Sequence, residues 1–160
     1  MFFRGKYKAF SNFSAIGFID EYGLRWKTAE HFYQAHKTNN QYLWLEVYGS
    51  PEGRDAKKFG SDLYKHGEQR EDWNKIRNAI MLKALIFKFQ QNPKAMKLLL
   101  STQGLIEETN TWHDNYWGNC VCKKCENLPG KNTLGRFLMR LRDKFLLEIE
   151  NALTVGSDST

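Results

Sequence analysis

The chain has 160 residues, of which 14% are aromatic and 26% are charged. This length suits one domain of common size with a real core, and the aromatic content argues against a disordered chain. No apolar run approaches membrane-spanning length, and the first residues lack the apolar core of a signal peptide, so we expect a cytoplasmic protein with no membrane partner. The formal net charge of +6 suits an anionic ligand such as a nucleotide or nucleic acid.

The N-terminal part predicts a small sheet. Residues 2–13 mix aromatic side chains with glycine and lysine, which indicates a strand or extended segment. Residues 16–19 and 24–26 flank the turn Asp20–Gly23 and predict a short hairpin.

A short helix is expected after Thr28, whose hydroxyl can accept the N–H of His31. Steps of four and three residues then place Glu30, Gln34 and Lys37 on one face. Free N–H groups and the helix dipole in the first turn favour the ionised form of Glu30. A capped surface helix with a solvated polar face is an equally good interpretation of this segment alone.

Hydrophobic periodicity and caps predict further helices over residues 42–48, 51–59, 73–91, 94–101 and 133–151. Gly60 is expected to close the second of these, and residues 61–69 read as a loop. Residues 105–109 predict a short strand. We expect a single domain over residues 1–151, of the helix-dominated α+β class, with residues 152–160 as a disordered tail.

Residues 110–130 form a long irregular segment, and loops of that length in a compact domain are usually functional. Three cysteines, Cys120, Cys122 and Cys125, lie within it and do not form a disulfide framework. Structural zinc sites usually come as two spaced pairs, so reduced cysteines in a turn and no metal are the favoured interpretation. Zinc held with His113 as fourth ligand is the alternative.

The residue types fit a nucleotide-like ligand. Trp73, Tyr116 and Trp117 offer faces on which a base can stack. Lys37 and Arg77 are cations for phosphate, and Glu30 and Asp114 are carboxylates for chemistry at a sugar carbon. The alternatives are that each tryptophan belongs to the core and that each cation is a solvated helix-surface charge.

Several motifs, read in order, resemble the NADAR (YbiA-like) family. They are Phe10-Ser11-Asn12-Phe13, the segment Trp26 to Lys37, Trp73, Met81, Lys88-Phe89, Asp114-x-x-Trp117-Gly118 and the segment Gly130 to Arg142. The resemblance implies a helix-rich α+β domain and an N-glycosidase that cleaves the bond between a nitrogen and C1 of a phosphorylated ribose. This sequence departs from the simpler members of the family at the cysteine-bearing insert between Gly118 and Gly130.

The resemblance places catalysis at Glu30, Trp73 and Asp114. Together with the residue types, it predicts substrate binding by a larger set: Asn12, Gln34, Lys37, Arg77, Tyr116, Trp117, Gly118 and Asn132. No cofactor is expected. We expect Glu30 to stabilise the developing sugar cation and to hold water, with Asp114 sharing water activation or binding the ribose.

Three functions are consistent with these residues and with the resemblance. The first is removal of ADP-ribose from guanine in DNA, which makes a toxin ADP-ribosyltransferase the functional partner. The second is the same chemistry on a small phosphoribosyl intermediate of riboflavin biosynthesis. The third is a non-catalytic module that binds ADP-ribose or NAD. Plain nucleic-acid binding rests on net charge alone.

Overall fold

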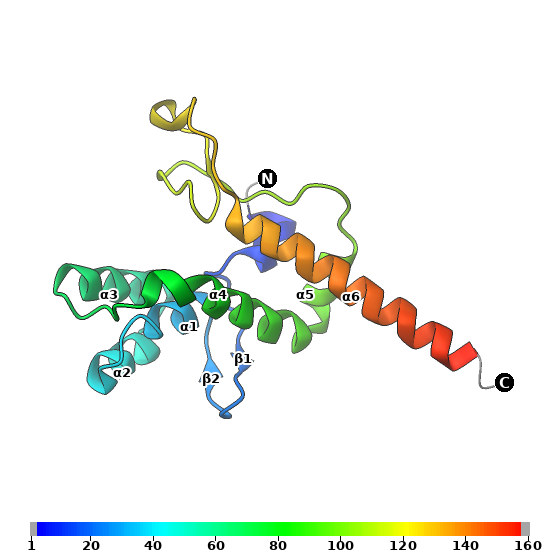
Figure 1. Cartoon of the computed structure of the whole chain (residues 1–160), viewed down its shortest axis with the longest axis horizontal. Helices are drawn as coiled ribbons and strands as arrows, with labels where there is room; N and C mark the ends of the chain where they lie inside the picture. The colour runs from blue at the N-terminus through cyan, green and yellow to red at the C-terminus, as the bar shows by residue number, and fades with distance from the viewer. Residues whose placement is uncertain (1–2, 158–160) are drawn as a thin grey trace. The chain divides into compact units, whose positions relative to one another are not determined.

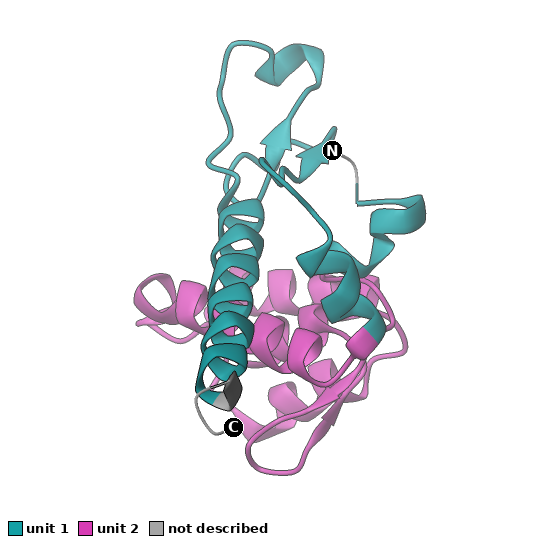
Figure 2. Ribbon diagram, turned by 90° about the vertical axis from the view of Figure 1, so that its right-hand side faces the viewer, with its two compact units in different colours: residues 1–10, 94–160 teal, residues 11–93 magenta. Residues whose placement is uncertain are grey.

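The computed structural model describes residues 3–157 and divides into two compact units. Unit 1 combines the residues up to Phe10 with those from Lys94 onward, and unit 2 spans Ser11–Pro93 (Figure 2). Helices dominate, with two small two-stranded sheets, which confirms the expected α+β class. The prediction of a single domain over residues 1–151 stays a prediction.

Unit 2 begins with the predicted hairpin. Strands β1 (Phe18–Ile19) and β2 (Arg25–Trp26) pair in antiparallel register. The Asp20 carboxylate closes the turn by accepting the backbone N–H groups of Tyr22 and Leu24 and the indole N–H of Trp26. The turn residues therefore specify this hairpin locally.

Four helices follow in unit 2: α1 (Ala29–Ala35), α2 (Gln41–Gly49), α3 (Gly53–Lys65) and α4 (Trp73–Gln90). The short helix α1 contacts each of the other three (Figure 1). Its buried face packs into an aromatic core with Phe18, Trp26 and Phe32 at its centre. All seven residues of α1 are buried, so its polar residues lie inside the unit.

Helix α3 corrects the prediction that Gly60 ends a helix and that residues 61–69 are a loop. The helix continues through Gly60 to Lys65. Its start is also shifted, because a reciprocal capping box between Glu52 and Asp55 begins it. Gly60 is buried and packs directly against Gln34 of α1, so close packing of two helices explains this glycine.

Unit 1 begins with a second correction. The predicted strand over residues 2–13 is a 3-10 helix, η1 (Gly5–Phe10). With three residues per turn, Tyr7 and Phe10 fall on the same side, and their ring centroids lie 5.7 Å apart. Phe3 packs edge-on against Phe10. Residues 1 and 2 lie outside the described residues.

The rest of unit 1 places a long loop between two helices. Its elements are α5 (Pro93–Leu100, whose first residue is the last of unit 2), β3 (Thr109–Asn110), β4 (Asn119–Cys120), the 3-10 turn η2 (Lys123–Cys125) and α6 (Thr133–Ser157). The strand predicted over residues 105–109 is reduced to β3, which pairs with β4 in parallel. Helix α6 runs to Ser157, whereas a disordered tail is predicted from residue 152; residues 158–160 lie outside the described residues. Among residues 3–157, no helix combines the length and apolar content needed to cross a lipid bilayer.

Candidate functional site

The polar face of α1 carries the predicted carboxylate. Thr28 caps the helix as expected, its Oγ1 accepting the N–H of His31 at 3.2 Å. Glu30 is only 5% exposed and Gln34 only 4%. Gln34 Nε2 donates a hydrogen bond to Glu30 Oε1 at 2.6 Å. The i,i+4 spacing predicted from sequence therefore produces a buried, hydrogen-bonded carboxylate.

The surroundings of Glu30 fix it in place. Its backbone N–H donates to the carbonyl of Asn12 at 3.1 Å, which joins the Phe10-Ser11-Asn12-Phe13 motif to α1. Gly53 at the start of α3 lies so close that an added Cβ would be 3.5 Å from Glu30 Cβ. The Asn12 side chain is buried, and its Oδ1 has no hydrogen-bond partner among residues 3–157.

Lys37 lies at the end of the same face and is half-buried. Its ammonium donates to the carbonyl of Gly60 at 3.3 Å. It also lies 5.7 Å from the ring centroid of Tyr33 and 6.0 Å from that of Trp73. Burial lowers the pKa of Lys37 to about 8, and the nearby Glu30 carboxylate opposes that shift.

Two further cations act on Lys37 and strengthen this effect. The positive charges of Lys57 and Arg77 both lower the Lys37 pKa, so they act on the same ammonium as the Glu30 carboxylate. Arg77 was predicted from sequence, but Lys57 was not. Lys57 lies on α3, and its ammonium is 5.5 Å from the Phe13 ring centroid. No local pattern marks it, because packing of α3 on α1 brings it to this position.

Trp73 is a core residue of unit 2. It is only 3% exposed, and its ring packs edge-on against Tyr33 with centroids 4.8 Å apart. Its contact with the candidate site runs through Lys37, whose ammonium lies beside the indole. The catalytic role given to Trp73 stays a prediction.

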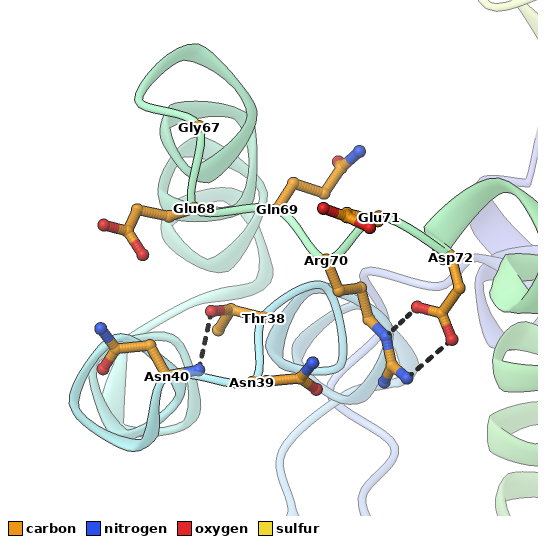
Figure 3. A pocket seen from close by; sticks show the side chains of 9 residues that line it. All are labelled: Thr38, Asn39, Asn40, Gly67, Glu68, Gln69, Arg70, Glu71 and Asp72. Atoms are coloured by element: carbon orange, nitrogen blue, oxygen red, sulfur yellow. Dashed lines mark hydrogen bonds and ion pairs between the residues drawn. The ribbon is translucent and has the colours of Figure 1, made fainter.

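A surface hollow of about 560 Å³ lies beside this corner of unit 2 (Figure 3). It is lined by two short segments, Thr38–Asn40 and Gly67–Asp72. Arg70 connects the hollow to Lys37, because the backbone N–H of Arg70 donates to the Lys37 carbonyl at 2.8 Å. The Arg70 guanidinium pairs with the Asp72 carboxylate. None of the residues predicted from sequence lines this hollow.

The second predicted carboxylate, Asp114, lies in the long loop of unit 1. Its Oδ1 accepts the N–H groups of Tyr116 at 3.0 Å and Trp117 at 2.8 Å. Asn110, which is fully buried, donates from Nδ2 to the Asp114 carbonyl and accepts the Asp114 N–H. The carboxylate therefore shapes its own loop through one oxygen.

The remaining predicted residues support this loop. The Tyr116 and Trp117 rings meet edge-on, and Lys131 Nζ lies 5.4 Å from the Tyr116 centroid. Gly118 must be glycine, because a Cβ there would overlap the carbonyl oxygen of Glu108. Asn132, at φ 48°, uses its amide to bind the backbone at residues 106 and 108. Its predicted part in substrate binding stays a prediction.

The cysteine cluster lies in the same unit. His113, Cys120, Cys122 and Cys125 present one nitrogen and three sulfurs within 4.8 Å of one another. The favoured interpretation from sequence was a turn of reduced cysteines without metal. The structure assembles the complete donor set of the alternative.

The predicted residues thus form two groups. Asn12, Glu30, Gln34, Lys37, Trp73 and Arg77 belong to unit 2, and the five from Asp114 to Asn132 belong to unit 1. The prediction that Glu30 and Asp114 meet around one sugar involves both units and stays a prediction.

Known proteins place these features in context. The model of the NADAR domain matches residues 1–146. The N-glycosidase YbiA of Escherichia coli (strain K12) is 34% identical over 142 residues, which cover 89% of this chain and 84% of that protein. The riboflavin biosynthesis protein PYRR, chloroplastic, of Zea mays is 33% identical over 92% of this chain and 25% of its own length.

The solution structure of E. coli YbiA has the same fold. It superimposes with a TM-score of 0.77 at 31% sequence identity, over 92% of this chain and 85% of that one. Sequence and fold agree over nearly the whole chain, and the chain belongs to the NADAR domain family.

Proposed function

We propose that this protein is an N-glycosidase that hydrolyses the bond between C1 of a phosphorylated ribose and a base nitrogen. The observation that carries the proposal is the buried Glu30–Gln34 pair together with the Lys37 ammonium, on which the charges of Glu30, Lys57 and Arg77 all act. Similarity to YbiA over most of both chains supports the reaction type. The finer proposal is that the substrate is ADP-ribosylated guanine in DNA.

Hydrolysis of an N-glycosidic bond is accelerated by a negative charge held in a fixed position beside C1 of the sugar. Hydrolysis breaks the C1–N bond and forms a C1–O bond with water, while the water gives up a proton and the departing base takes one. Positive charge grows on C1 and the ring oxygen in the transition state, and a preorganised carboxylate stabilises it. Glu30 suits this role because Gln34 and the packed backbone around it hold the carboxylate in one orientation.

The cations suit the phosphate. Lys57 and Arg77 both act electrostatically on Lys37, so we assign these three cations to phosphate binding. Burial already holds the Lys37 pKa at about 8, so an incoming phosphate would favour its protonated form. A diphosphate such as that of ADP-ribose would engage more than one of these cations.

Asp114 and its aromatic neighbours are proposed to complete the site. Only Oδ1 of Asp114 accepts the two loop N–H groups, so we assign Oδ2 to water or to a ribose hydroxyl. Tyr116 and Trp117 would contact the base. This part of the proposal rests on the family motif Asp114-x-x-Trp117-Gly118.

The second candidate substrate is a small phosphoribosyl intermediate of riboflavin biosynthesis. It is favoured by relatives named as riboflavin biosynthesis proteins in Zea mays and Vibrio vulnificus. The cysteine-bearing insert between Gly118 and Gly130, where simpler members have a short glycine-rich loop, resembles the variant form of the family that acts on ADP-ribose, and on that resemblance we rank the ADP-ribose substrate first. A toxin ADP-ribosyltransferase would then supply the modified DNA.

A paired assay tests the proposal. The purified protein is incubated with ADP-ribosylated guanine in a DNA oligonucleotide and, separately, with a phosphoribosyl riboflavin intermediate, and base release is measured. Glu30→Gln keeps an oxygen that can accept the Gln34 hydrogen bond, so it should fold and bind while turnover falls by about 100-fold or more. Glu46→Gln, an exposed residue on α2, is the matched control and should retain activity.

The outcomes separate the candidates. Release from the oligonucleotide alone supports the first substrate, and release from the free intermediate alone supports the second. Binding of ADP-ribose with neither product would establish the non-catalytic module. Near-normal hydrolysis by Glu30→Gln would refute the assignment of Glu30.

A further inference from the structure

A four-residue cluster in unit 1 has no role in the proposed reaction. Its members are His113 and the three cysteines, Cys120, Cys122 and Cys125. They come from three pieces of local structure: the turn after β3, the end of β4, and the 3-10 turn η2 together with Cys122, the residue before it. Figure 1 shows this segment as the yellow loop that precedes α6. All the cysteines of the protein are in it.

The distances fit tetrahedral zinc. His113 Nδ1 lies 3.2 Å from Cys122 Sγ and 3.4 Å from Cys125 Sγ. All four donor atoms lie within 4.8 Å of one another. With Zn–S of about 2.3 Å and Zn–N of about 2.0 Å, neighbouring ligand atoms of a tetrahedron are roughly 3.5 to 3.8 Å apart. Small side-chain adjustments are enough to close the cluster on one ion.

The backbone is built to hold these side chains. Cys120 is positioned by the β3–β4 pairing and by Asn115 Oδ1, which accepts its N–H at 2.8 Å. Cys125 N–H donates to the Cys122 carbonyl at 2.9 Å, which turns both side chains toward one point. The tight turn is therefore set by hydrogen bonds that do not involve the sulfurs.

His113 is in a conformation that its neighbours must support. Its φ is +65°, a left-handed backbone conformation that costs a non-glycine residue about 1 kcal/mol or more. This conformation aims Nδ1 at two sulfurs and the backbone N–H at the third, 3.3 Å from Cys120 Sγ. N–H groups that donate to ligating sulfurs are a common second layer of metal–thiolate sites.

Burial also suits a structural ion. Cys120 and Cys125 are buried, Cys122 is half-buried and His113 is exposed, so one side of the cluster opens to solvent for metal entry. Three thiolates with one Zn²⁺ leave a single negative charge. Lys123 and Lys124 lie in η2, between the second and third cysteines, and offset that charge.

We propose that His113 Nδ1 and the sulfurs of Cys120, Cys122 and Cys125 bind one Zn²⁺ as a structural site that folds the loop over residues 110–130. Each cysteine gives its thiol proton to solvent as it becomes a ligand. The donor set is complete, with four ligands and no open position, which is typical of structural zinc. This inference does not depend on the proposed activity.

The first test measures metal and thiols in the wild-type protein, purified without added chelator. We expect one zinc ion per chain by elemental analysis and three titratable thiols after denaturation with chelator. Cobalt in place of zinc should give the visible absorption of a tetrahedral thiolate site. A wild-type chain that binds no zinc or cobalt when supplied with either would overturn the proposal. A single titratable thiol would also overturn it, because it would indicate a disulfide.

The second test uses matched variants. Cys122→Ser removes a half-buried ligand, and His113→Asn removes the nitrogen ligand while keeping a residue that tolerates positive φ. Zinc affinity should fall by about tenfold or more in each. Val121→Ser and His66→Asn, both exposed and outside the donor set, should bind zinc as the wild type does. Unchanged zinc affinity in both ligand variants would refute the donor set.

Discussion

Because Gly60 contacts Gln34, we expect Gly60→Ala to destabilise the protein, whereas a glycine-to-alanine substitution in a helix usually stabilises it. Gly60 lies within α3, and replacing a helical glycine by alanine normally stabilises a protein by about 1 kcal/mol. Here an added Cβ would overlap Gln34 Oε1 and lie 2.7 Å from Gln34 Cδ. Gln34 would have to move, and its hydrogen bond to Glu30 would be lost.

The expected magnitude follows from these contacts. Overpacking of a buried helix contact costs about 1 to 3 kcal/mol, and loss of a hydrogen bond to a carboxylate costs about 1.5 to 3 kcal/mol. The gain in helix propensity offsets about 1 kcal/mol of this. We therefore expect Gly60→Ala to lower the free energy of unfolding by about 2 to 5 kcal/mol. The melting temperature should fall by on the order of 10 °C.

Urea unfolding measures the change, and base release measures its effect on the site. Because the displaced Gln34 no longer orients Glu30, turnover per folded molecule should fall as well. Gly49→Ala is the matched control: it is the last residue of α2, and an added Cβ meets nothing within 4 Å. A Gly60→Ala protein as stable as wild type or more so would refute the close packing of α1 and α3 at this point.

Two further predictions concern a buried cation and the loop carboxylate. Lys88 is fully buried, and burial lowers its pKa from 10.5 to about 7. Between these values the unfolded chain binds a proton that the folded chain does not, so the free energy of unfolding should rise with pH by up to ~1.4 kcal/mol per unit and level off below about pH 7. Lys88→Met should remove the Lys88 contribution, including the rise between about pH 7 and 8, while the rise that Lys37 contributes above its own pKa of about 8 should remain. Asp114→Asn keeps an oxygen for the N–H groups of Tyr116 and Trp117, so it should keep stability within about 0.5 kcal/mol of wild type and lose turnover. Asp114→Ala should also lose about 1 kcal/mol of stability.

The measurements are urea unfolding across this pH range and base release at one pH. Removing the Lys88 ammonium leaves the Ser11 carbonyl with two other donors, the N–H and hydroxyl of Ser14, so Lys88→Met creates no unpaired acceptor there. A wild-type stability that stays flat above pH 7 would contradict the depressed pKa of Lys88. Full turnover in Asp114→Asn would exclude that carboxylate from the reaction.

Features set by short-range interactions were predictable. The Thr28 cap and the i,i+4 relation of Glu30 and Gln34 depend on residues within one helical turn, and both were found as expected. The hairpin was predictable for the same reason, because Asp20 supplies its own turn hydrogen bonds. The family could also be predicted, because its motifs are short runs of residues that can be read directly in the sequence.

Features that depend on distant partners were not predictable. Gly60 resembles a helix end until Gln34 is seen to occupy the space beside it, and η1 resembles a strand although no second strand pairs with it among the described residues. The burial of Lys88 could not be predicted either, since its helix position alone is compatible with solvent.

The sequence by itself determined most of the helices, the Thr28 cap, the hairpin and the polar face that carries Glu30, because these follow from propensity, periodicity and hydrogen bonds between near neighbours. Only the tertiary structure decided that Glu30 is buried against Gln34, that Lys57 joins Lys37, and that His113 meets the three cysteines. Each of these depends on packing or a backbone turn that brings separate segments together, and the energy of such contacts is absent from any single stretch of sequence.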